Sequence, residues 1–181
     1  MPREVAILDL RSLDIAPGAA RRLELRVPPV ALRLGGQEYA TEPAAPEVGL
    51  EVARSLSGLH LRLRSEVTLT GPCFRCLGDA RVPLRIDASE FVAEGRPDDA
   101  PFDEDLDSAY VEDGALDLET WARDAIAEAV PPTILCREDC AGLCATCGAD
   151  LNAGPCGCGP PAPDPRWDAL RGLAERLGRE D

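Results

Sequence analysis

The sequence predicts an α+β protein with an antiparallel, β-rich N-terminal part, and three observations lead to this fold class. Apolar and polar residues alternate with a period of two in the first half, which is typical of strands with one buried face. One helical apolar stripe follows in the second half, and six of the eight cysteines lie between Cys136 and Cys158. We expect four segments: an antiparallel β-rich part over 1–94, an acidic connecting loop over 95–116, a helix packed on the sheet over 117–135, and a cysteine-rich metal-binding segment with a terminal helix over 136–181.

The clearest strand pattern runs from Leu59 to Leu69, where alternate residues are apolar on both sides of an expected break at Ser65-Glu66. The same alternation occurs at 82–86 and 48–52, and it is less regular at 5–10 and 23–27. Glycine and proline pairs predict turns at Pro17-Gly18, Gly35-Gly36, Ser57-Gly58 and Gly71-Pro72.

Two helices are predicted in the second half. Asp117 can cap a helix that ends at Pro131-Pro132, and its apolar stripe consists of Leu118, Trp121, Ala122, Ala125, Ile126 and Ala129. Asp164 and Pro165 can begin the terminal helix, whose apolar face consists of Trp167, Leu170, Leu173 and Leu177.

The chain is acidic, and the acidity is concentrated. It has 181 residues, with 33 acidic and 19 basic side chains and a net charge of −14. The segment from Asp87 to Glu119 holds 13 acids and only Arg96 as a base, which excludes it as a phosphate-binding surface. The N-terminus has no secretory pattern, and no apolar run approaches the roughly 20 residues of a membrane span, so we expect a cytoplasmic protein without a membrane partner.

The eight cysteines predict two tetrahedral metal sites. In a reducing cytosol, cysteines at short spacings are more typical of metal ligands than of disulfides. Loop closure is easiest between near neighbours, which groups Cys144, Cys147, Cys156 and Cys158 as site 2. Site 1 then consists of Cys73, Cys76, Cys136 and Cys140, and it would join the two halves of the chain. We expect two zinc ions, with iron as an alternative because four thiolates suit both metals.

Catalysis is not expected. A zinc ion with four cysteine ligands has no open coordination position, so its role is structural. Cys73 and Cys76 lie between two strands and not at a helix N-terminus that would lower a thiol pKa, which disfavours a thioredoxin-like role. His60 is the only histidine and alternates outward on its strand, and no nucleophile elbow, phosphate loop or dinucleotide fingerprint is present. The remaining alternative for the cysteines is a set of disulfides.

An ordered set of motifs spans nearly the whole chain: Leu8–Arg11, Cys73–Leu77, Leu116–Leu118, Pro131-Pro132, Cys136–Cys144, Cys147–Asn152, Cys156, Cys158 and Asp164–Arg166. This set resembles the YceD family, the large ribosomal RNA subunit accumulation proteins. The resemblance implies a role in accumulation of large-subunit ribosomal RNA, and hence in ribosome assembly. It also implies a gene that often neighbours the gene for a small basic protein of the large subunit. It names no catalytic or RNA-contacting residue.

We therefore expect a non-catalytic ribosome-assembly factor that binds the large ribosomal subunit precursor or a basic ribosomal protein. The acidic segment would contact the partner, with Phe102, Leu106 and Tyr110 as apolar anchors. One alternative is direct RNA binding through an arginine-bearing sheet face, formed by Arg62, Arg64, Arg75, Arg81 and Arg85. Another is a thiol redox enzyme that uses the Cys73/Cys76 pair.

Overall fold

The computed structural model of the protein describes residues 2–94, 108–159 and 166. Its elements, in chain order, are β1 (Arg3–Glu4), β2 (Ile7–Asp9), the 3-10 turn η1 (Arg11–Leu13), β3 (Ala20–Arg26), β4 (Ala31–Leu34), β5 (Gln37–Glu42), β6 (Glu47–Arg54), β7 (Gly58–Pro72), β8 (Asp79–Ala93), β9 (Val111–Glu112), β10 (Ala115–Asp117) and α1 (Leu118–Glu128). The strand-rich composition with a helix agrees with the predicted α+β class.

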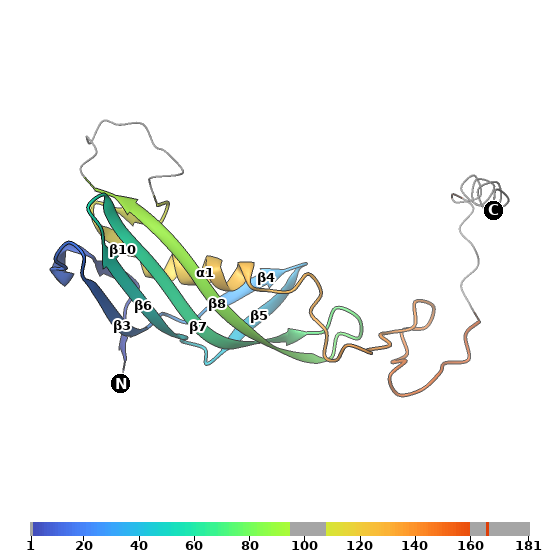
Figure 1. The fold of residues 1–181 in the computed structure, drawn as a ribbon. Coiled ribbons are helices and arrows are strands. Elements are labelled where there is room, and N and C mark those ends of the chain that lie inside the picture. The colour runs from blue at the N-terminus through green and yellow to red at the C-terminus, as the bar shows by residue number, and fades with distance from the viewer. Residues whose placement is uncertain (1, 95–107, 160–165, 167–181) are drawn as a thin grey trace.

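The long strand β7 is the central strand of the main sheet, where it pairs with β5, β6 and β8. β8 pairs with it antiparallel over all 15 of its residues. The opposite edge of β7 is shared, because β6 pairs with residues 59–64 and β5 with residues 68–70. The strand order is β1-β3-β6-β7-β5-β4 with β8 on the other side of β7, so the β4–β5 hairpin branches away from β3 and β6 (Figure 1). All of these pairs are antiparallel except the short β1–β3 pair.

Two details of the predicted strands are wrong. The expected break at Ser65-Glu66 does not exist, because Ser65 stays in phase, faces inward and donates its hydroxyl to the Glu47 carbonyl at 2.7 Å. The expected turn at Gly71-Pro72 is part of β7, and the chain reverses over Cys73–Gly78 instead, where the Cys73 amide donates to the Gly78 carbonyl at 2.7 Å. The predicted Gly35-Gly36 turn is confirmed between β4 and β5, two strands that the alternation did not predict.

A second, small sheet has the order β2-β10-β9. It corrects the predicted connecting loop over 95–116, because residues 111–112 and 115–117 are strands and β10 pairs with β2. Pairing to a segment distant in sequence is a tertiary effect that the local acidic composition does not reveal. The middle of the acidic segment, 95–107, and the predicted terminal helix from Asp164 onward, apart from Arg166, lie outside the described residues.

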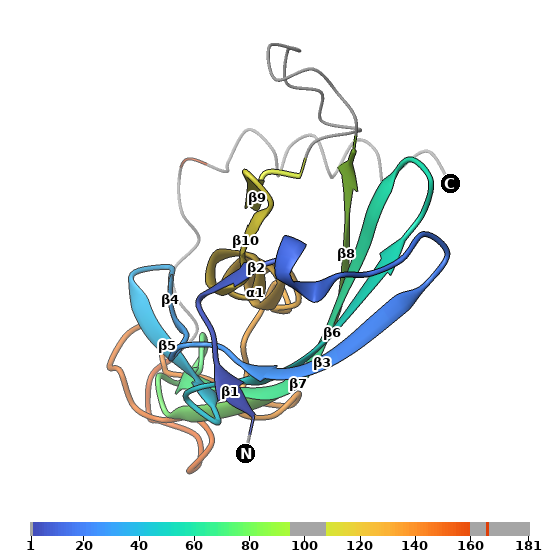
Figure 2. The same ribbon diagram turned by 90° about the vertical axis from the view of Figure 1, so that its left-hand side faces the viewer.

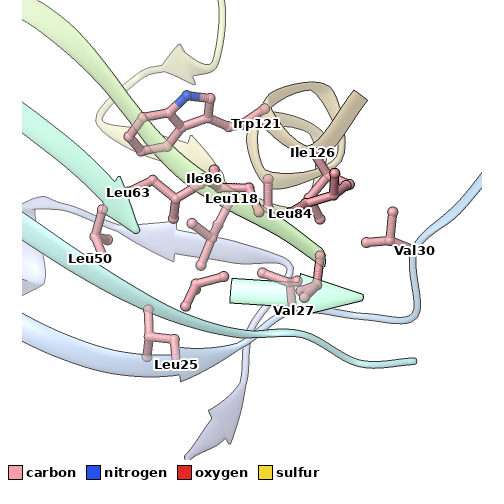
Figure 3. Close-up of a cluster of buried hydrophobic side chains, with 14 of the residues drawn as sticks. Leu25, Val27, Val30, Leu50, Leu63, Leu84, Ile86, Leu118, Trp121 and Ile126 are labelled. Carbon is pink, nitrogen blue, oxygen red and sulfur yellow. The ribbon is translucent and has the colours of Figure 1, made fainter. Parts of the chain in front are cut away.

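Helix α1 begins as predicted, with the Asp117 carboxylate accepting a hydrogen bond from the Thr120 amide at 2.9 Å. It lies in the concave side of the curved sheet, where Figure 2 shows it end-on with strands around it. Figure 3 shows Leu118, Trp121 and Ile126 among side chains from β7 and β8. The predicted apolar stripe is buried except for Ala129, which is half-buried and caps the C-terminus.

Within the described residues, no helix has both the length and the apolar character needed to cross a membrane.

Candidate metal centres

The β7–β8 turn and the chain that follows α1 meet at one end of the molecule (Figure 1). Cys73 and Cys76 lie in the turn, while Cys136 and Cys140 follow the helix. Peptide hydrogen bonds join the two segments, because the Phe74 amide donates to the Ile134 carbonyl at 2.8 Å and the Leu143 amide donates to the Arg75 carbonyl at 3.1 Å. Segments far apart in the sequence are thus held side by side by the backbone as well as by their cysteines.

The first cysteine group consists of Cys73, Cys76, Cys136 and Cys140, whose sulfur atoms all lie within 4.8 Å of one another. The Cys73 and Cys140 sulfurs are 3.8 Å apart, and those of Cys76 and Cys136 are 3.7 Å apart. A tetrahedral zinc ion with Zn–S bonds of about 2.3 Å requires sulfurs about 3.8 Å apart. A disulfide would need a separation of about 2.05 Å. The donor set therefore fits a tetrahedral metal ion, and the eight cysteines are free thiols in the structure.

The second cysteine group consists of Cys144, Cys147, Cys156 and Cys158, and its sulfurs also lie within 4.8 Å of one another. Gly148 has a φ of 73°, a left-handed conformation that lets the chain turn back after Cys147. The turn is closed by two hydrogen bonds, from the Gly148 amide to the Cys144 carbonyl and from the Cys144 amide to the Ala149 carbonyl, both at 2.8 Å. Its four cysteines are half-buried or exposed, whereas Cys73 and Cys140 belong to the hydrophobic core.

The peptide backbone favours a thiolate at the first cysteine of each Cys-x2-Cys turn. Burial acts to raise the pKa of Cys73, but peptide N–H groups directed at its sulfur outweigh burial and lower the pKa to about 6. The amides of Cys147 and Thr146 likewise lower the pKa of Cys144 to about 6. Loss of hydration at the sulfur and the nearby Cys140 raise the pKa of Cys136 to about 12, although that residue as a whole is exposed. Without a cation, four crowded sulfurs cannot all be charged.

Two side chains outside the cysteine set hold the first group in place. The Arg75 guanidinium donates to the Cys140 carbonyl at 3.0 Å, and the Asn152 amide donates to the Cys140 sulfur at 3.6 Å. Sequence reasoning assigned no role to Asn152. The available signal was its spacing from Asp150, since two turn-forming side chains two residues apart can bond each other and the local backbone.

The predicted arginine face needs one correction. Arg75 is not on the sheet, because it lies in the β7–β8 turn and contacts the cysteine segment. The other four arginines lie on β7 and β8 and form ion pairs: Arg62–Asp87, Arg64–Asp87, Arg81–Glu42 and Arg85–Glu66. His60 is exposed on β7 as predicted, with its ring 4.7 Å from that of Phe91. The face therefore carries mixed charge.

The fold and these sulfurs define a β-rich protein with two four-cysteine clusters, each of which could hold a metal ion. The family model of the large ribosomal RNA subunit accumulation protein YceD matches residues 61–174, and the chain belongs to this family. The resemblance inferred from the motifs is thereby confirmed. The family is named for accumulation of an RNA and not for an enzymatic reaction.

The chain is also similar to individual proteins. An uncharacterized protein of Mycobacterium tuberculosis is 32% identical over 176 residues, which cover 96% of this chain and 82% of the relative. One from Mycobacterium leprae is 30% identical over 151 residues, covering 82% of this chain and 69% of the relative. The chloroplastic YCED homolog 1 of Arabidopsis thaliana, named a large ribosomal RNA subunit accumulation protein, is 30% identical over 66 residues, covering 36% and 21% of the two chains. No solved structure matches the chain significantly.

Proposed function

We propose that this chain is a non-catalytic ribosome-assembly factor, which supports accumulation of the large-subunit ribosomal RNA by binding a basic ribosomal protein, free or within the large-subunit precursor. The process in this proposal, accumulation of the large-subunit ribosomal RNA, is taken from the name of the family. The observation that carries the choice of a protein over RNA as direct partner is the pairing of the sheet-face arginines with carboxylates.

The arginine pairs weaken the case for an RNA surface. Arg62 donates to both carboxylate oxygens of Asp87, at 2.7 and 2.6 Å. Arg81 likewise donates to both carboxylate oxygens of Glu42. The Arg62 hydrogen bonds hold the pKa of Asp87 below its ordinary value, because they stabilise the charged carboxylate beside the arginine. An RNA phosphate would have to displace these carboxylates, in a chain of net charge −14.

Each cysteine group, in this proposal, binds one zinc ion. The first ion would link the β7–β8 turn to the segment after α1, and the second would close the surface turn after Cys144. Four thiolates leave no coordination position for a substrate, so the ions would stabilise the fold and carry no reaction. Elemental analysis of protein purified without chelator should give about two zinc ions per chain. Iron would show as absorbance in the visible range, and a metal-free protein with disulfides would contradict the proposal.

The acidic segment from Asp87 to Glu119 is our candidate for the surface that binds the partner. Its 13 acids and single arginine suit a basic protein, because charge complementarity raises the association rate. Phe102 and Leu106 would provide apolar contacts that slow dissociation, and both lie outside the described residues. Tyr110, the third predicted anchor, is half-buried against the core, where its ring stacks on Trp121 with the centroids 6.2 Å apart.

Affinity capture from lysate, with and without nuclease, tests this function. We expect a basic ribosomal protein to stay bound after nuclease treatment. Its capture should weaken, and its salt dependence should flatten, when the central acids are made neutral. The neutralised set is Asp103, Glu104, Asp105 and Asp107, replaced by Asn or Gln.

The matched control neutralises the same number of charges on the sheet face, by replacing Arg62, Arg64, Arg81 and Arg85 with Gln. This variant should retain the protein partner. Capture of RNA that disappears only in the arginine variant would contradict a protein partner and indicate the sheet face as the contact.

A further inference from the structure

One side chain joins the two cysteine groups. Asn152, the only asparagine of the sequence, lies in the loop between Cys147 and Cys156 of the second group. Its amide nevertheless contacts the first group, where it donates to the Cys140 sulfur at 3.6 Å and accepts from the Arg137 guanidinium at 2.7 Å. The loop of the second group is therefore joined to the first group by hydrogen bonds as well as by the chain.

Every hydrogen-bonding capacity of the Asn152 amide is used. Its oxygen accepts from Arg137 and from the Ala141 amide at 2.8 Å, and its nitrogen donates to the Cys140 sulfur and to the Asp150 carboxylate at 2.7 Å. An amide has two acceptor and two donor positions, so none is left over. A flipped amide would place its N–H groups against two donors, which fixes the orientation with a donor toward sulfur.

The position of Asn152 depends on the second loop. The Asp150 carboxylate accepts from the Asn152 peptide N–H at 2.9 Å, and the Leu151 amide donates to the Gly142 carbonyl at 2.9 Å. A β-bridge between Asp150 and Leu143 also joins this loop to the residues just before Cys144. Because Cys147 and Cys156 flank this loop, an ion bound by the second group would hold the loop, and with it the Asn152 amide, in place.

We propose that Asn152 couples the two metal sites, so that filling the second cysteine group raises the metal affinity of the first. This inference rests on the proposed metal binding. An N–H donor directed at a metal-bound thiolate stabilises its negative charge and orients it, and loss of such outer contacts typically lowers metal affinity about 10–100-fold. Coupling between two binding sites is reciprocal, so a filled first group raises the affinity of the second by the same factor.

The test measures each group separately in the full-length chain. Cysteines are alkylated over a series of buffered free zinc concentrations, and mass spectrometry of the peptides reports the zinc concentration that half-protects each group. In Asn152→Ala, the concentration that half-protects the first group should rise about 10–100-fold. Vacating the second group with Cys156→Ser and Cys158→Ser should raise the zinc concentration that half-protects the first group by a similar factor. Adding Asn152→Ala to that background should then change nothing further, because the coupling is already lost.

Asn152→Asp tests whether Asn152 acts through its contact with the Cys140 sulfur or only by holding the loop in place. The carboxylate keeps the acceptor for Arg137 and Ala141, but it cannot donate to Cys140 and places a charge near its sulfur. We expect this variant to bind zinc at the first group as weakly as Asn152→Ala or more weakly. Glu138→Gln, at an exposed position of the same segment, should behave as the wild type.

Three outcomes distinguish the possibilities. Unchanged protection of the first group in Asn152→Ala, with zinc still protecting both groups, overturns the coupling and leaves the proposed metal binding intact. Wild-type affinity in Asn152→Asp overturns the role of the sulfur contact. Absence of zinc protection in the wild type overturns the metal binding itself.

Discussion

Two glycines on the neighbouring strands β7 and β6 should tolerate substitution by alanine very differently. A Cβ at Gly71 would lie 2.7 Å from Cε1 of Tyr39, a buried ring whose hydroxyl donates to the Pro72 carbonyl at 2.7 Å. Gly71→Ala should therefore lower the free energy of unfolding by about 1–3 kcal/mol through overpacking. Urea unfolding measures the change as a shift in midpoint at constant slope.

Gly49→Ala on β6 is the matched control. Its Cβ would meet nothing closer than the Glu24 carboxylate at 3.6 Å, an ordinary contact. Removing a glycine from a strand interior at such a position should stabilise the protein by about 0.5–1 kcal/mol. Equal losses in the two variants would contradict the packing argument.

The ion pair between Asp87 and Arg62 should make the stability of the protein depend on pH. Hydrogen bonds from Arg62 hold its pKa below 3.8 in the folded protein. A carboxyl group with a lowered folded-state pKa stabilises the protein above its unfolded pKa, and that contribution is lost as the pH falls through the folded value. The difference in Tm between wild type and Asp87→Asn should thus be present at about pH 6 and vanish toward about pH 2. Glu112→Gln, an exposed carboxylate on β9, removes the same charge and serves as control.

At the scale of elements, the junction between β10 and α1 depends on one cap. Asp117 ends β10 and accepts from the Thr120 amide, so it satisfies one of the free donors of the first helical turn. Asp117→Ala should cost about 1 kcal/mol, and Asp117→Ser, which keeps a capping oxygen, should cost less. Thermal unfolding followed by near-UV circular dichroism of Trp121 measures both, since this buried ring lies in the first turns of the helix. Equal losses would show that the cap is not the cause.

At the scale of the whole molecule, the two cysteine groups should contribute unequally to stability. The first group joins segments separated by 59 residues between Cys76 and Cys136, whereas the second closes a local turn. In excess zinc, Cys136→Ser should destabilise the fold by about 4 kcal/mol or more, as for other losses of a metal, which corresponds to about 8–16 °C in Tm. Cys147→Ser should cost less, because it loosens mainly the local turn after Cys144 and removes the coupling inferred above. Comparable losses in both variants would contradict this division of roles.

The alternation of leucines was enough to predict most of β7, and the Asp117 cap with its apolar stripe was enough to predict α1. Both patterns arise from local geometry, because a strand places every second side chain on one face and a helix places residues three or four apart together. Ser65 shows where this logic fails. A polar residue at an inward position looks like a break, and only the distant Glu47 carbonyl, which accepts its hydroxyl, makes the position acceptable.

Residue type and spacing along the chain are sufficient to indicate the β-rich fold class, the family and two sets of four thiols, since each depends on short stretches of sequence. Three features depend on contacts between distant segments and emerge only from the folded chain. These are the division of one edge of β7 between β5 and β6, the pairing of the face arginines with carboxylates, and the reach of Asn152 from one cysteine group to the other. Hydrogen bonds and ion pairs act over a few ångströms in space. Which residues come that close depends on how the whole chain packs, and their separation along the sequence does not reveal it.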